Sequence, residues 1–388
     1  MEETRKKERL YWLDYAKGIA IYLVVIGHCE TSTELHNWIY SFHMGLFFML
    51  SGMTFRPQKY ASLSEITWDK VKKRLLPYLT ICFFNIIPWI VNYKILDTEN
   101  KDNLLTILFG IVYSNWDAVT MVNNVVWFLP ALMCVEILAW LMVKLQGDSK
   151  SGLLNTALVF LALNYGDYLY QNGEEISLAL PWHLNSVFGN TCYFLIGYLV
   201  MRHWNVKGWY QRRIVSIRER KPGHKWKTYT GYAVMLATLV AASIISVMAI
   251  GKISFASGHY KSMFGFLTAS ISMIVVILVF SMLTERIRIL SVPFSYLGKN
   301  TLWVLCIHKP VIYITESLWH VNNISEHIVL YIITMVVFMF PLIALGNRFA
   351  PFVVGKSINN KAPRWVSYLL IGIYSVAAAI MMVKYLVL

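Results

Sequence analysis

The sequence predicts an all-α integral membrane protein, a polytopic bundle of about 10–11 transmembrane helices with a cytoplasmic N-terminus. Hydrophobic residues make up 57% of the 388 residues and charged residues only 14%. A soluble core of this size does not need that balance. The apolar residues also gather in runs of bilayer length, and most basic residues fall in the short segments between these runs.

The apolar runs define the expected membrane spans, of which 152–166 is short for a crossing. They are 11–29, 37–55, 76–96, 125–145, 152–166, 181–201, 229–250, 262–283, 296–316, 327–347 and 366–387. The first run follows a basic tail but lacks a small-residue cleavage site, so we interpret it as an uncleaved helix. A further apolar run at 104–112 is too short to span, which predicts a surface-lying or re-entrant helix.

The loop charges predict the orientation. Lys and Arg gather at 5–9, 56–74, 202–228 and 348–364, which alternate with loops that carry few cations. The positive-inside rule places these basic segments in the cytoplasm. Eleven crossings would then put Leu388 on the outer side.

The net charge of +14 does not point to nucleic acid, because the basic residues follow the membrane topology. The five cysteines lie in or beside apolar segments without C-x-x-C spacing. We therefore expect neither a disulfide framework nor a metal site.

Two ionisable residues interrupt the first span. Lys17 and His28 are eleven residues apart, about three helical turns, so they share one face about 16 Å apart. Ionisable groups inside a bilayer are costly, which favours a functional role. The alternative is a flanking lysine and a chance histidine.

Several short motifs follow one another at definite spacings. They are Leu13–Ala20 with Gly27-His28, Phe42–Met53, Lys70–Tyr78, Trp127–Leu129 with Glu136, Leu180–Trp182, Phe194–Tyr198, and Gly298–Leu302 with His308. Their ordered combination resembles the membrane-bound acyltransferase-3 family, especially its fucose 4-O-acetylase-like branch. We interpret 1–388 as a single transmembrane acyltransferase domain, with a core at about 9–350, a last helix at about 366–387 and no appended soluble domain.

The resemblance implies an integral-membrane O-acyltransferase of the cell (inner or cytoplasmic) membrane. It would move an acyl group, usually acetyl, from cytoplasmic acyl-CoA to a hydroxyl of a cell-surface or lipid-linked carbohydrate. Acetyl-CoA or another acyl-CoA is then a co-substrate, with no bound cofactor. The implied partners are acyl-CoA, the carbohydrate acceptor and the lipid bilayer, with glycan-assembly proteins as further candidates and no nucleic acid.

The resemblance also implies site residues. The Arg/Lys-x10-His pattern of the family maps onto Lys17 and His28. Its basic motif maps onto Lys70 and Lys73 by spacing, while Arg74 is the only arginine of that cluster. We predict that the cations bind the phosphates of acyl-CoA, although basic residues at a cytoplasmic helix start also serve topology.

The chemistry of acyl transfer assigns further candidates. A hydroxyl acceptor needs a base with a pKa near neutrality, and His28 is the candidate. Asn300, Trp127 or a backbone amide are candidates to stabilise the thioester oxygen in the transition state. His43 is expected near the outer end of the first span, either beside His28 in one cavity or as an interfacial histidine.

Other polar groups have two readings each. Glu136 lies mid-span and must pair, protonate or face water, either as a group that orients His28 or as a buried structural acid. Asp14 is a candidate ion-pair partner for Lys17. His308, before the helix-breaking Pro310, is a candidate for lining the pocket.

A transporter or flippase is the alternative function. His28, Glu136 and His308 would then form a proton or substrate pathway. Such a protein is expected to contain two related halves with broken helices in matching places, and the sequence shows no such internal symmetry.

Overall fold

Helices build the computed structural model of this chain, which describes residues 10–29, 32–96, 101–115, 119–174, 179–219, 221–250, 262–319, 334–356 and 364–387. No strand occurs within these ranges. The all-α class predicted from composition is therefore confirmed.

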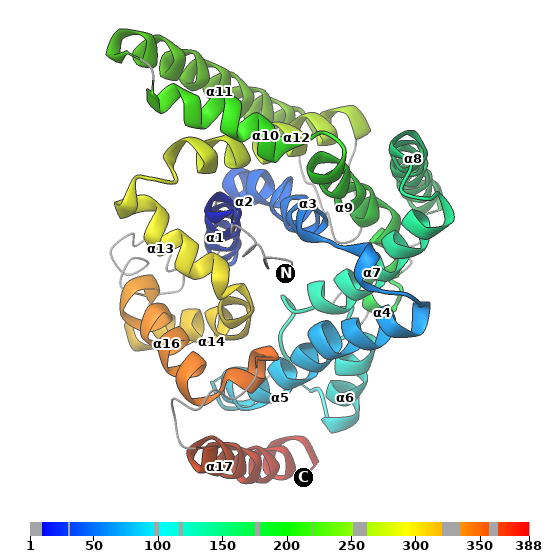
Figure 1. Cartoon of the computed structure of the whole chain (residues 1–388). Helices are drawn as coiled ribbons and strands as arrows, with labels where there is room; N and C mark the ends of the chain where they lie inside the picture. Colours follow the sequence, from blue (N-terminus) through cyan, green and yellow to red (C-terminus); the bar gives the residue numbers. More distant parts are fainter. Residues whose placement is uncertain are drawn as a thin grey trace, which may run out of the picture.

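The helices that matter for the site lie in two groups. In the first half of the chain they are α1 (Tyr11–Gly27), α2 (Thr33–Tyr40), α3 (His43–Thr54), α4 (Leu63–Lys70), η2 (Val71–Leu75), α5 (Leu76–Ile90), η3 (Val91–Leu96), α6 (Leu104–Tyr113), α7 (Phe128–Leu145) and α8 (Lys150–Glu174). In the second half they are η4 (Pro181–Ser186), α9 (Val187–Arg202), α10 (Val206–Trp209), α11 (Pro222–Ile250), α12 (Met263–Thr284), α13 (Arg288–Lys299), α14 (Thr301–Trp319), η8 (Thr334–Met339), α16 (Phe340–Phe349), η9 (Pro351–Val354), α17 (Arg364–Met382) and η10 (Val383–Val387). Figure 1 shows α1, α2 and α3 toward the middle, α10, α11 and α12 along one side, and α5, α6 and α17 along the opposite side.

Six described helical segments are long and apolar enough to cross a membrane. They are Leu63–Ile95, Phe128–Leu145, Pro181–Arg202, Gly223–Ile250, Met263–Thr284 and Trp365–Val387. Only 17% of the most apolar stretch of Gly223–Ile250 and 11% of that of Trp365–Val387 is buried inside the protein, as lipid-facing helices require. The chain is thus a multi-pass membrane protein.

Three expected spans are broken. The run 37–55 forms α2 and α3, separated at Ser41 and Phe42, where the Ser41 hydroxyl donates to Trp38 O at 2.7 Å. The run 296–316 is divided at Asn300, which separates α13 from α14 and has a φ of −123°. The run 181–201 begins with the irregular turn η4. Hydropathy alone does not register these interruptions, because the residues at each break are apolar or small enough to continue the pattern.

Other expected elements differ in length. The short run at 152–166 belongs to α8, a helix of 25 residues. The run at 104–112 forms the short helix α6, whose Leu105 and Val112 are exposed. Of the expected span 327–347, residues 327–333 lie outside the described part of the chain, and the rest forms η8 and α16.

Reciprocal glycine contacts join α1 to α13. A Cβ on Gly18 would overlap the carbonyl oxygen of Phe294, and a Cβ on Gly298 would overlap the carbonyl oxygen of Asp14. Small residues of this kind let membrane helices approach until their backbones touch. The contact places the start of α14 against the first half of α1.

The same arrangement joins α3 to α9. A Cβ on Gly52 would overlap Phe194 O, and a Cβ on Gly197 would overlap Met49 O. Both glycines belong to motifs that the sequence shares with the acyltransferase-3 pattern. Their side of each helix is therefore determined by backbone packing.

We expect Gly52→Ala to lower the free energy of unfolding by about 1–3 kcal/mol, because the new methyl group must push α9 away from α3. The thermal unfolding midpoint of the purified protein in detergent measures this loss. Gly231→Ala is the matched control, since nothing lies within 4 Å of a Cβ added on that α11 residue. Equal midpoints for the two variants would contradict the proposed glycine packing.

Candidate functional site

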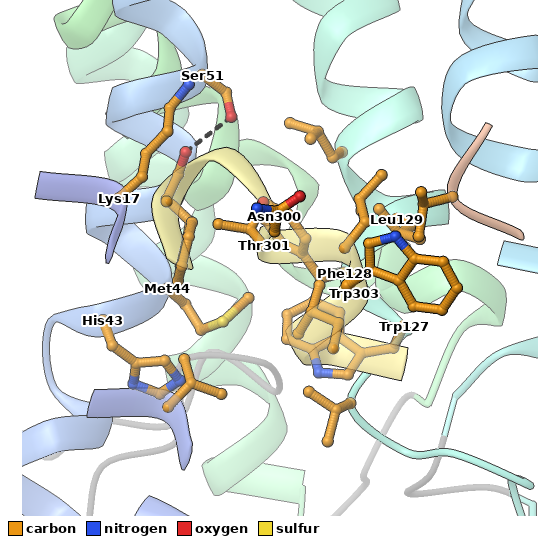
Figure 2. Close-up of a pocket in the computed structure, with 18 of the residues that line it drawn as sticks. Lys17, His43, Met44, Ser51, Trp127, Phe128, Leu129, Asn300, Thr301 and Trp303 are labelled. Atoms are coloured by element: carbon orange, nitrogen blue, oxygen red, sulfur yellow. Dashed lines mark hydrogen bonds between the residues drawn. The ribbon is translucent and has the colours of Figure 1, made fainter. Parts of the chain in front are cut away.

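A cavity of about 600 Å³ lies between α1, α3, α7 and α14. Figure 2 shows Lys17 reaching toward Ser51, with His43 farther along the same wall on the other side of Met44. The opposite wall includes Trp127, which precedes α7. The cavity is large enough for a small-molecule ligand, which usually occupies roughly 300–1,000 Å³.

Cations line the part of the cavity beside the first half of α1. They are Lys17, Arg74, Lys299 and Lys356. Lys299 belongs here because its neighbour Gly298 packs directly on Asp14. The only acidic residue that lines the cavity in the described ranges is Asp14, so this end carries excess positive charge.

The break between α13 and α14 holds Lys356 in place. Lys356 Nζ donates to Asn300 Oδ1 at 3.1 Å and to Asn347 Oδ1 at 2.8 Å. The Asn347 amide donates to Asn300 Oδ1 at 2.9 Å, and the Asn300 amide donates to Tyr296 O at 2.9 Å. Partial burial lowers the pKa of Lys356. Asn300 therefore orients a cation at the cavity wall.

Imidazole and phenol groups line the cavity near the other end of α1. His28 follows the last residue of this helix, and its Nδ1 lies 3.2 Å from the Tyr40 hydroxyl. The Tyr40 ring stacks on His36 at 3.9 Å and meets His43 edge-on at 4.8 Å between centroids. His28 and His43, far apart on the expected spans, thus share one wall through Tyr40.

Backbone contacts set the tautomer of two histidines. His43 Nδ1 donates to Ile39 O at 2.8 Å, and His308 Nδ1 donates to Val304 O at 2.7 Å. A carbonyl only accepts, so in the neutral ring the Nε2 atom of each carries the lone pair. The His308 ring lies 5.4 Å from the His28 ring, and its buried Nε2 has no hydrogen-bond partner within the described ranges.

An ion trio connects α7 to the helix that contains α4, η2 and α5. Glu136 accepts from Arg74 Nε at 2.9 Å, from Arg74 Nη2 at 3.0 Å and from Lys70 Nζ at 2.9 Å. The side chains of Glu136 and Lys70 are only 4% and 7% exposed. Two cations so close to one carboxylate resolve the cost of a mid-span acid, since a buried charge must be paired.

The cavity brings together seven of the residues predicted from the sequence. They are Asp14, Lys17, His28, His43, Arg74, Trp127 and Asn300. Lys70, Lys73, Glu136 and His308 do not line it. Lys73 pairs instead with Asp69 at 2.6 Å on an exposed surface.

The structure also answers what Glu136 contacts. Both of its oxygens are bound by Lys70 and Arg74, whereas the hydrogen bond of His28 goes to Tyr40. The expected alternative in which Glu136 orients His28 is thus not the arrangement found. The alternative of a buried, paired acid is the one that the geometry shows.

Four cavity residues escaped the sequence analysis. Tyr40 and His36 precede His43 at spacings of three and seven residues, a helical periodicity that would have drawn attention to them. Lys299 and Lys356 gave no such signal, because basic residues near membrane ends also serve topology.

A strained turn supports the Trp127 wall. Trp182 and His183 both have positive φ values, 56° and 52°, which are rare for residues with side chains. The turn is held to α6 by a hydrogen bond from Trp182 Nε1 to Val112 O at 2.9 Å. It places the His183 ring 4.5 Å from the Trp127 ring.

The fold and site define a multi-pass membrane protein with a polar cavity that joins cations to histidines. A family model described as an acyltransferase domain matches residues 10–384. The chain belongs to this acyltransferase family, which confirms the resemblance at the family level and favours an enzyme over a transporter. No curated protein and no solved structure shows a detectable similarity to it.

Metal ligation was also considered for the site. Among the residues that the structure describes, no group of three or more His, Cys, Asp or Glu side chains is placed to hold a metal ion.

We expect Glu136→Gln to destabilise the protein by about 3–5 kcal/mol, because it leaves Lys70 and Arg74 buried without their counter-charge. Thermal unfolding in detergent measures the effect. Glu65→Gln is the control, since Glu65 is an exposed acid on α4. Adding Lys70→Met to Glu136→Gln should restore part of the loss. A single Glu136→Gln variant as stable as the control would contradict the structural role of the trio.

Proposed function

We propose that this acyltransferase is an O-acyltransferase of the cell membrane, which moves an acetyl group from cytoplasmic acetyl-CoA to a carbohydrate hydroxyl near the outer face. The observation that carries the proposal is the single cavity with cations at one part and Tyr40-linked histidines at another. The motif order supports placement in the fucose 4-O-acetylase-like branch. The charge of the loops supports the orientation, with the cation end toward the cytoplasm.

The cations of the cavity suit the donor. Acyl-CoA carries several phosphate charges, which Lys and Arg side chains bind through charge-assisted hydrogen bonds. Lys17, Arg74, Lys299 and Lys356 face the cavity and are assigned this role. Lys70 acts indirectly, because with Glu136 it fixes the position of Arg74.

His28 is assigned as the general base. With its Nδ1–H donated to the Tyr40 oxygen, its Nε2 lone pair takes the proton of the acceptor hydroxyl. The hydroxyl oxygen then attacks the thioester carbonyl carbon, the C–S bond breaks, and CoA leaves with the proton as a free thiol. The products are an acetyl ester and CoA. His43 is assigned as a second polar group at the same wall.

Trp127 is the better candidate for stabilising the thioester oxygen. The Asn300 amide already donates to Tyr296 O, and its oxygen accepts from Lys356 and Asn347. Trp127 lines the cavity, and its indole N–H has no hydrogen bond within the described residues. A preorganised N–H aimed at a developing oxyanion lowers the barrier, by about 3–4 kcal/mol in well-studied cases.

We expect His28→Ala to abolish acetyl transfer while acetyl-CoA still binds, because the variant loses the base and keeps the cations. Mass spectrometry of surface glycans compares cells that express the wild-type chain, the variant, or neither; only the wild type should add acetyl esters. His224→Ala, an exposed histidine at the start of α11, is the control with normal transfer. Normal esterification by His28→Ala would show that another group is the base.

We expect Lys356→Gln to raise the Kd for acetyl-CoA about tenfold, because one charge-assisted hydrogen bond to a phosphate contributes about 1.5 kcal/mol or more. Isothermal titration of the purified protein measures the Kd. Lys73→Gln is the matched control, since Lys73 pairs with Asp69 outside the cavity. A larger loss of affinity in Lys73→Gln than in Lys356→Gln would place the donor phosphates on the exposed basic cluster instead.

A further inference from the structure

A second cavity, of about 240 Å³, lies beside the first. It is lined by Asn85, Pro88, Trp89, Tyr93, residues 119–124, Lys309, Pro310 and Tyr313. Asn124 lines both cavities, so one side chain separates the two spaces. The function proposed above makes no use of this second space.

Two helices supply its polar and aromatic walls. On α5, Asn85, Pro88 and Trp89 follow the spacing of residues that share one helix face. On α14, Lys309 and Tyr313 are one turn apart on a common face. The wall is thus a designed face of each helix rather than a chance gap.

The aromatic rings form a continuous surface. Trp89 and Tyr93 lie 5.5 Å apart between centroids, with planes inclined at 36°. The hydroxyls of Tyr93 and Tyr313 lie 3.2 Å apart and share a hydrogen bond. Rings with an apolar face and a polar edge pack well against the C–H face of a sugar, while their hydroxyls meet its hydroxyls.

Asn124 is the amide that remains for a ligand. Asn85 donates to Ile81 O at 2.8 Å, and Asn123 donates to Leu305 O at 3.2 Å and accepts from Val125 N at 3.1 Å. Asn124 is exposed to the two cavities, and its side chain makes no hydrogen bond within the described part of the chain. A carboxamide supplies both a donor and an acceptor, which matches a hydroxyl group.

The second cavity is close to the proposed base. Lys309 follows His308 directly, and the His308 ring lies 5.4 Å from the His28 ring. The charge of Lys309 also acts on His28. A ligand held between Lys309 and Asn124 therefore reaches the histidine wall without passing the cation end of the main cavity.

We propose that the second cavity binds a sugar ring of the acceptor, stacked on Trp89, Tyr93 and Tyr313, and that Asn124 positions its reacting hydroxyl toward His28. This inference rests on the function proposed above. Its volume is just below the roughly 300–1,000 Å³ typical of drug-sized ligands, which suits one sugar ring. Acyl-CoA does not fit the same description, because its phosphates need several cations and this cavity offers Lys309 alone among the described Lys and Arg residues.

The test separates donor binding from acceptor use. Asn124→Leu removes the carboxamide at nearly constant size, and Tyr313→Leu removes a ring of the stacking surface. Asn155→Leu, at an exposed position on α8, is the matched control. The measurements are the Kd for acetyl-CoA with each purified protein, and base-released acetate from the surface glycans of cells that express equal amounts of each chain.

We expect Asn124→Leu and Tyr313→Leu to lower glycan acetate about tenfold or more with a Kd for acetyl-CoA close to that of the wild type, since each removes contacts to the acceptor alone. Wild-type acetate in both variants would overturn the inference. A parallel loss of donor affinity would also overturn it, because the second cavity would then belong to the donor site or to the fold.

The proposed function fails in a distinguishable way. A wild-type chain that neither binds acetyl-CoA nor esterifies any glycan would overturn that function and this inference with it. Tyr313→Phe guards against misfolding as an explanation, since it keeps the ring and loses only the hydroxyl. Glycan acetate closer to the wild type in Tyr313→Phe than in Tyr313→Leu supports stacking, and an equal loss in both variants overturns it.

Discussion

The backbone contact between α1 and α13 is the constraint from which the site follows. Gly18 and Gly298 let the two helices touch, and so the break at Asn300 falls beside Asp14 and Lys17. A larger residue at either glycine would displace the start of α14. The distance from this contact to His28 is then set by the length of α1 alone, because a helix has a fixed rise per residue.

Charged residues in this protein perform two tasks that the sequence does not distinguish. Lys70 and Glu136 are buried and satisfy each other, while Lys356 and Lys299 face the cavity. Arg74 belongs to both groups, since it holds Glu136 and also lines the cavity. It is therefore the residue through which the paired charges of the fold are connected to the cations proposed for the donor.

The predictable part of the structure is the part that local pattern determines. Composition and the length of apolar runs predicted the all-α membrane class, and the eleven-residue spacing placed Lys17 and His28 on one wall. The partner of Glu136 was not predictable, because it lies 62 and 66 residues earlier in the chain, on another helix. The break at Asn300 and the role of Lys356 depend on tertiary contacts in the same way.

The ion trio has a consequence for the order in which the helices enter the membrane. Lys70 and Arg74 are synthesised before Glu136, so α4 and α5 are already present when α7 emerges. An isolated carboxylate at the centre of a transmembrane helix costs about 2.5–3.5 kcal/mol or more on insertion. Delivery of α7 beside its two cations removes that cost, so the biogenesis of this helix depends on a segment made some 60 residues earlier.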